Sequence, residues 1–177
     1  MVKFSNTWAD VFKTTIETSL MHLAGEKLDY LEIGIFEGQS AHLMFENILT
    51  NPESTYTGID PWILGGKEIA EVNLRNHQNV TIISEKSHLV LEDFCRKNKK
   101  FDIAYIDGNH SYEGALSDTV LTWELAKHII IWDDYGGRAF SEDYGVRMAV
   151  TAFLRNIPDS QYKVIADGYQ FAIQKLG

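Results

Sequence analysis

The chain has few cysteines, which form disulfides, and few prolines, which restrict the backbone. It contains one cysteine, Cys95, and three prolines among 177 residues. One cysteine excludes a disulfide within the chain and suits a reducing compartment. No stretch approaches the roughly 20 apolar residues of a membrane-spanning helix, and the first ten residues lack the long apolar run of a signal peptide. We therefore expect a cytoplasmic protein with no membrane partner.

The chain also lacks an excess of basic residues. It has 16 lysines and arginines against 25 aspartates and glutamates, so its formal net charge is -9. Non-specific nucleic-acid binding needs a basic surface, so we expect no nucleic-acid partner. The length and the 45% hydrophobic content predict a single globular domain over residues 1–177.

Segments of strand character alternate with segments of helical spacing along the whole chain. Strands are expected at 28–36, 55–60, 80–84, 101–107 and 128–134, with two more around the turn at Asp167-Gly168. Helices are expected at 6–24, 38–50, 68–76, 87–98, 112–126 and 145–157. This alternation predicts an α/β fold. We expect a Rossmann-like three-layer αβα sandwich with a mostly parallel seven-stranded sheet and an antiparallel C-terminal hairpin strand.

Acidic residues stand at the ends of four of the expected strands. They are Glu32, Asp60, Asp107 and the pair Asp133-Asp134. In open α/β sheets, ligands bind outside the carboxyl ends of the strands. One such acid usually caps a helix or forms a turn, but four on the same edge favour a ligand site.

The loop after the first strand, "EIGIFEGQS", contains Gly34 and Gly38, which permit a tight turn and a close approach of ligand. The dinucleotide fingerprint G-x-G-x-x-G fails because position 36 is phenylalanine. Glu32 suits a cationic ligand better than a pyrophosphate, and Asp60 is placed to accept hydrogen bonds from ribose hydroxyls. These features favour an adenosyl ligand with an amino-acid tail over NAD.

The fourth and fifth strand ends carry the residues suited to catalysis. Carboxylates at Asp107, Asp133 and Asp134 suit a hard divalent cation such as Mg²⁺; alternatively, Asp133 ends a turn and Asp134 is solvated. His110 can accept a proton from a hydroxyl near neutral pH, or it caps the helix that begins near Tyr112.

Several motifs in the expected order resemble one known family. They are "YLEIGIFEGQS", "YTGIDPW", "FDIAYIDGNHSYEGALSD", "HIIIWDDY" and "GVRMAVTAF". Together they are similar to the class I S-adenosylmethionine (SAM) methyltransferases over residues 28–177. Within that family, they resemble the metal-dependent small-molecule O-methyltransferases, which include macrolide and aminocoumarin sugar enzymes.

The resemblance implies a set of site residues. Those implied to bind the cofactor are Glu32, Gly34, Gly38, Ser40, Asp60, Ser87 and Asp107. It implies Asp107, Asp133 and Asp134 as metal ligands and His110, with Asp107, as the catalytic residues, His110 acting as the base.

The predicted function is therefore SAM-dependent, Mg²⁺-assisted O-methylation of a small hydroxylated substrate, such as a sugar or another natural product. Two alternatives remain open: a SAM-binding protein without catalysis, and a nicotinamide-dependent oxidoreductase. Residues 1–25, expected to be largely helical, and the loop 136–144 are the candidate substrate lids. The sequence leaves a homo-oligomer open.

Overall fold

The computed structural model describes residues 2–5, 7, 9–137 and 144–176, and its strands form one seven-stranded sheet. The strand order is β3-β2-β1-β4-β5-β7-β6. The strands are β1 (Asp29–Ile33), β2 (Thr55–Ile59), β3 (Val80–Ile83), β4 (Phe101–Ile106), β5 (Ala126–Trp132), β6 (Tyr162–Asp167) and β7 (Phe171–Lys175).

Helices connect the strands in the order that the sequence predicts. They are α1 (Asp10–Thr15), α2 (Gln39–Asn47), α3 (Lys67–Leu74), α4 (Ser87–Arg96), α5 (Tyr112–Leu125) and α6 (Tyr144–Leu154). α1 continues into a π-helical turn, η1 (Ile16–Leu20), and a 3-10 turn, η2 (Met21–Leu23); a further 3-10 turn, η3 (Asp159–Gln161), precedes β6. In the described part of the chain, no helix is both long and apolar enough to cross a membrane.

The predicted sheet is confirmed in its topology. β1 to β5 pair in parallel, and β7 pairs antiparallel with both β5 and β6. The C-terminal hairpin therefore places β7, not β6, beside β5.

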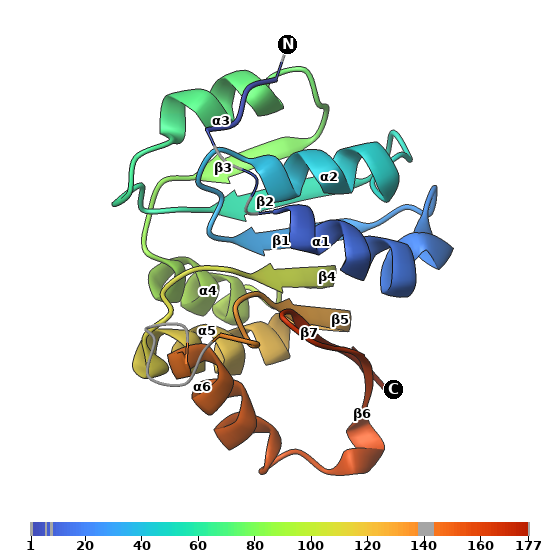
Figure 1. The fold of residues 1–177 in the computed structure, drawn as a ribbon, viewed down its shortest axis with the longest axis vertical. Coiled ribbons are helices and arrows are strands. Elements are labelled where there is room, and N and C mark those ends of the chain that lie inside the picture. The colour runs from blue at the N-terminus through green and yellow to red at the C-terminus, as the bar shows by residue number, and fades with distance from the viewer. Residues whose placement is uncertain (1, 6, 8, 138–143, 177) are drawn as a thin grey trace.

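Helices cover both faces of the sheet and give the expected three layers (Figure 1). On one face, α1, α2 and α3 pack over a core that includes Phe12, Met44, Leu74, Tyr30 and Tyr105. On the other face, α4, α5 and α6 pack over a second core that includes Leu91, Phe94, Val150, Ile106 and Trp132. The two cores bury both faces of β1, β4 and β5, which explains the nearly continuous apolar runs in those strands.

The chain order reverses between β1 and β4. From β1 the connections lead to β2 and β3, and from β4 they lead the other way to β5. Such a reversal opens a crevice at the carboxyl ends of the two central strands. The residues after Ile33 and Ile106, which are partners in the register of β1 and β4, therefore face one another at this crevice.

Candidate functional site

The loop that follows β1 lies directly against the end of β4. Gly34 has a φ of 89°, and its N–H donates to the carbonyl of Ile59 at 2.9 Å. A Cβ on Gly34 would lie 1.9 Å from the carbonyl oxygen of Asp107. Only glycine permits both this backbone conformation and this contact, so Gly34 joins the two halves of the crevice.

Asp60 fixes the conformation of the same loop. Its Oδ2 accepts hydrogen bonds from the backbone N–H groups of Ile35 (2.8 Å) and Phe36 (2.9 Å). Its Oδ1 accepts one from the N–H of Trp62 at 2.6 Å. Phe36 has a φ of 48°, a left-handed conformation that these bonds help to stabilise. The carboxylate predicted to hold a ribose thus binds three backbone amides, and its ribose contact stays a prediction.

Glu32 and Ser40, both predicted to contact a cofactor, contact each other. Glu32 is fully buried, and its Oε1 accepts a hydrogen bond from the Ser40 hydroxyl in the first turn of α2. Burial raises the pKa of Glu32 to about 8, against the opposing effects of the Ser40 and Tyr56 hydroxyls. Glu32 thus links the end of β1 to the first turn of α2.

Gly38 and Ser87 each stand at the start of a helix. Gly38, with a φ of 77°, is the residue before α2, and its carbonyl accepts from the N–H of His42. Ser87 is the first residue of α4, and its side chain lowers the pKa of the buried Asp118, which burial raises to about 6. Ser87 thus interacts with a buried residue of α5.

A small cavity lies between the β1 loop and the ends of β4 and β5. Its volume is about 60 Å³, and it is lined by Ala9, Ile35, Phe36, Glu37, Gln39, Ser40, Asp107 and Asp133. This volume admits a few water molecules but is too small for a nucleoside. Ala9 closes one side of the cavity, and its N–H lies 3.3 Å from Oε1 of Gln39.

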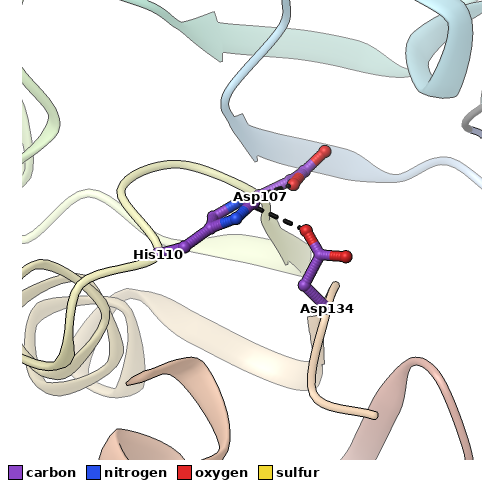
Figure 2. Close-up of side chains that lie close together, drawn as sticks. All are labelled: Asp107, His110 and Asp134. Carbon is purple, nitrogen blue, oxygen red and sulfur yellow. Dashed lines mark hydrogen bonds and ion pairs between the residues drawn. The ribbon is translucent and has the colours of Figure 1, made fainter. Parts of the chain in front are cut away.

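Asp107, His110 and Asp134 form the compact polar cluster at the crevice (Figure 2). Nε2 of His110 lies 3.4 Å from Oδ1 of Asp107 and 3.2 Å from Oδ2 of Asp134, so the imidazole stands between the two carboxylates. One donor atom from each residue lies within 4.8 Å of the others. Two carboxylates and an imidazole at such distances are a donor set suited to a divalent cation.

The alternative that His110 caps the following helix is wrong. Ser111 is the N-cap of α5, and its side chain accepts a hydrogen bond from the N–H of Gly114 at 3.1 Å. His110 therefore remains directed to the two carboxylates.

Asp133, the third predicted metal ligand, lies outside this cluster. Its Oδ2 accepts a hydrogen bond from the Tyr105 hydroxyl at 2.6 Å, and its Oδ1 accepts one from the N–H of Asp134 at 3.0 Å. The backbone at Asp134 is left-handed, with a φ of 55°, and the two neighbouring side chains bind different partners. Asp133 lines the cavity, whereas Asp134 faces His110.

The acidic residues at the crevice repel one another and are partly shielded from water. Burial raises the pKa of Asp107 to about 7; the His110 hydrogen bond opposes this rise, and the charges of Asp133 and Asp134 add to it. Burial also raises the pKa of Asp133, opposed by its hydrogen bond from Tyr105 and reinforced by Asp134. Raised carboxyl pKa values at the mouth of a crevice are typical of functional sites.

Three residues at the site were missed in the sequence. Tyr105 stands within a buried apolar strand, where an aromatic residue predicts core packing, and Tyr169 and Gln170 stand in what the sequence shows only as a hairpin turn. In the structure, Tyr105 and Tyr169 donate to Asp133 and Asp134, and the amide of Gln170 donates to the Tyr105 hydroxyl at 3.2 Å.

Comparisons with known proteins give a family match. A family model described as a methyltransferase domain matches residues 31–135, the segment from β1 to the acidic pair. An uncharacterized protein of Acanthamoeba polyphaga mimivirus is 29% identical over 147 residues, which are 77% of this chain and 64% of the viral protein. The chain thus spans less than two thirds of that curated relative.

Solved structures with the same fold include two O-methyltransferases. The Bacillus cereus O-methyltransferase in complex with S-adenosylhomocysteine (SAH) has a TM-score of 0.70 and 14% identity, over 99% of this chain and 83% of that chain. The Streptomyces achromogenes O-methyltransferase TomG, involved in tomaymycin synthesis and solved with SAM, has a TM-score of 0.61 and 16% identity, over 100% of this chain and 92% of that chain. At these identities the likeness is one of fold.

Proposed function

The chain belongs to the methyltransferase-domain family and has the class I methyltransferase fold, and on this premise we propose that it transfers a methyl group from SAM to a hydroxyl of a small molecule, assisted by a divalent cation. The observation that carries the proposal is the position of the cluster of Asp107, His110 and Asp134. It lies at the β1–β4 crevice, where a Cβ on Gly34 would collide with the Asp107 carbonyl.

The chemistry of the residues at the crevice suits SAM, and the cavity of about 60 Å³ must enlarge to admit it. The β1 loop brings its backbone close to the cavity through Gly34, and Asp107 and Asp133 give that cavity an acidic lining. An acidic lining favours a sulfonium cation and disfavours a diphosphate. SAM, when bound, supplies an electrophilic methyl group. Gly34, Gly38 and Asp60 would hold its amino-acid and ribose parts. Ser40 and Ser87, at the starts of α2 and α4, would also contact it.

The acidic cluster also fits a divalent cation. Asp107 and Asp134 offer hard oxygen donors, and Asp133 would join them only if its side chain turned away from Tyr105. A cation there would supply Lewis acidity, lowering the pKa of a substrate hydroxyl. His110 would accept the hydroxyl proton, because its side chain is 31% exposed and lies beside both carboxylates. Asp107 would keep that imidazole oriented.

The substrate we propose is a small hydroxylated molecule. The net charge of -9 disfavours a nucleic acid, and the single cysteine suits the cytoplasm. An extract-wide search for methylated products tests the substrate class, since enrichment of methylated RNA alone would contradict it.

Ligand choice tests the family-level part of the proposal. We expect calorimetric binding of SAH and none of NAD, because the β1 loop lacks a pyrophosphate cradle. Incubation with SAM and a metabolite extract should then yield a product heavier by one CH₂ unit. NAD binding without any response to SAH would support the oxidoreductase alternative. SAH binding with no methylated product would support a binding protein without catalysis.

We also propose that the described residues before α1 (2–5, 7 and 9) act as a lid over the cofactor. The Asn73 side chain accepts from the N–H of Lys3 (3.1 Å) and donates to its carbonyl (2.9 Å). The Glu37 carboxylate accepts from the N–H of Ser5 at 2.6 Å. Asn73 and Glu37 are themselves buried, and Ala9 lines the cavity. Lys3 and Ser5 thus contact α3 and the β1 loop, and a movement of these residues or of the loop would enlarge the cavity. The other candidate lid, 136–144, falls mostly outside the described residues.

Weakening this lid should accelerate exchange of the cofactor. Glu37→Gln replaces a charge-assisted hydrogen bond with a neutral one, a loss of about 1 kcal/mol, so the association and dissociation rate constants of SAH should both rise about fivefold. Stopped-flow measurement checks this, with the exposed Glu68→Gln on α3 as the matched control. Rate constants equal to the wild-type values in Glu37→Gln would show that the segment does not limit access.

A further inference from the structure

The tip of the β6–β7 hairpin reaches the acidic cluster from the far end of the sequence. The Tyr169 hydroxyl donates a hydrogen bond to Oδ1 of Asp134, while Oδ2 of Asp134 lies 3.2 Å from Nε2 of His110. One oxygen of this carboxylate is thus bound by the hairpin tip, and the other faces the crevice.

The pairing of the strands brings Asp134 and Tyr169 close together. β5 and β7 run antiparallel, and their last registered pair is Trp132 with Phe171. Asp134 is two residues after Trp132, and Tyr169 is two residues before Phe171, so the two residues lie on neighbouring segments. A shift of one residue in the register would direct the tyrosine to the other face of the sheet.

The backbone of the hairpin tip is packed tightly against the turn that follows Asp134. The N–H of Gly136 donates to the carbonyl of Tyr169 at 2.8 Å. A Cβ on Gly136 would lie 2.6 Å from the Cα of Tyr169. Backbone contacts therefore fix the Cα of Tyr169, from which its side chain extends to Asp134.

The two neighbouring carboxylates are supported in different ways. Asp133 is bound from the interior by Tyr105, which the buried Gln170 in turn contacts. Asp134 has a strained left-handed backbone and a side chain that is 15% exposed. Tyr169 itself is 45% exposed, so its hydroxyl can be removed without disturbing either hydrophobic core.

We propose that Tyr169 is a positioning residue for the metal site, an inference that rests on the proposed function. By occupying Oδ1 of Asp134, Tyr169 directs Oδ2 toward Asp107 and His110, where a cation would be bound. Hydrogen-bond donors behind ligating carboxylates orient the ligand, and their loss typically weakens metal affinity by about 10–100-fold.

Direct Mn²⁺ binding to the full chain tests this role without a substrate. We expect Tyr169→Phe to raise the Kd for Mn²⁺, measured by calorimetry and electron paramagnetic resonance, by at least about tenfold. The SAH affinity and the melting temperature should stay at wild-type values, because a merely structural role would move these instead. Tyr162→Phe, at the other end of the same hairpin, is the matched control and should bind Mn²⁺ as the wild type does.

Each other outcome has a separate meaning. Unchanged or tighter Mn²⁺ binding by Tyr169→Phe, with normal binding by the wild type, overturns the positioning role alone. A wild-type protein that binds SAH but not Mn²⁺ overturns the metal proposal and this inference with it, and leaves SAM-dependent methyl transfer standing. A wild-type protein that binds Mn²⁺ but not SAH contradicts the proposed methyl transfer, and the Tyr169→Phe comparison still decides the positioning role.

Discussion

Exhaustive chelation is expected to abolish methyl transfer, and added Mg²⁺ is expected to restore it. Asp107 and Asp134 lie close together at the crevice, and burial and the neighbouring charges raise the pKa of Asp107 to about 7. A cation would offset the repulsion between these carboxylates. Below pH 7 the proton on Asp107 competes with the cation, so the Mg²⁺ concentration for half-maximal rate should rise as the pH falls.

A variant at Asp107 tests whether this carboxylate binds the metal. Asp107→Asn should raise the Mg²⁺ requirement by at least about tenfold, since even an indirect contact to a ligand is worth that much. Asp159→Asn, an exposed aspartate on η3, is the control and should keep the wild-type requirement. Full activity after chelation would contradict the metal proposal, leaving Asp107 and His110 as a metal-free acid–base pair.

The fold was predictable because apolar runs and apolar spacing mark most of its strands and helices. The continuous apolar runs of β4 and β5 predict strands covered on both faces, and the structure buries them so. The first helix, predicted at 6–24, was less predictable. α1 ends at Thr15 and continues as a π turn, where the Thr18 hydroxyl donates to the carbonyl of Thr14 at 2.7 Å. Such side-chain bonds compete with regular helix geometry, and apolar spacing does not report them. Residues 6 and 8 of that helix lie outside the described residues.

The positions of the site residues were predictable, but the directions of their side chains were not. Parallel strands bring Asp60, Asp107, Asp133 and Asp134 to one edge of the sheet whatever the loops do. The direction of each carboxylate depends on local backbone, such as the positive φ of Asp134, and on donors from distant segments. The sequence therefore predicts three equivalent metal ligands, whereas the structure separates Asp133 from the other two.

His110 has two possible roles, because its imidazole lies between two carboxylates. As a base it would accept the substrate proton; as a ligand it would bind the cation beside Asp107 and Asp134. The two roles predict different effects of one substitution on metal affinity. A base contributes to turnover alone, whereas a ligand contributes to both turnover and metal affinity.

Substitution His110→Ala is expected to lower turnover roughly 10²–10⁴-fold, the usual contribution of a general base. The SAH affinity should stay near the wild-type value, because the residues that we propose to hold the cofactor follow β1 and β2. The Mn²⁺ affinity should also change little; a Kd raised about tenfold or more would make His110 a ligand instead. At saturating metal, the wild-type rate should fall as the pH is lowered, because a protonated imidazole accepts no proton, and the variant should lose this dependence. His22→Ala, an exposed histidine in η2, should behave as the wild type. Wild-type turnover by His110→Ala would restrict His110 to its ion pairs with Asp107 and Asp134 and leave the activation of the hydroxyl to the cation.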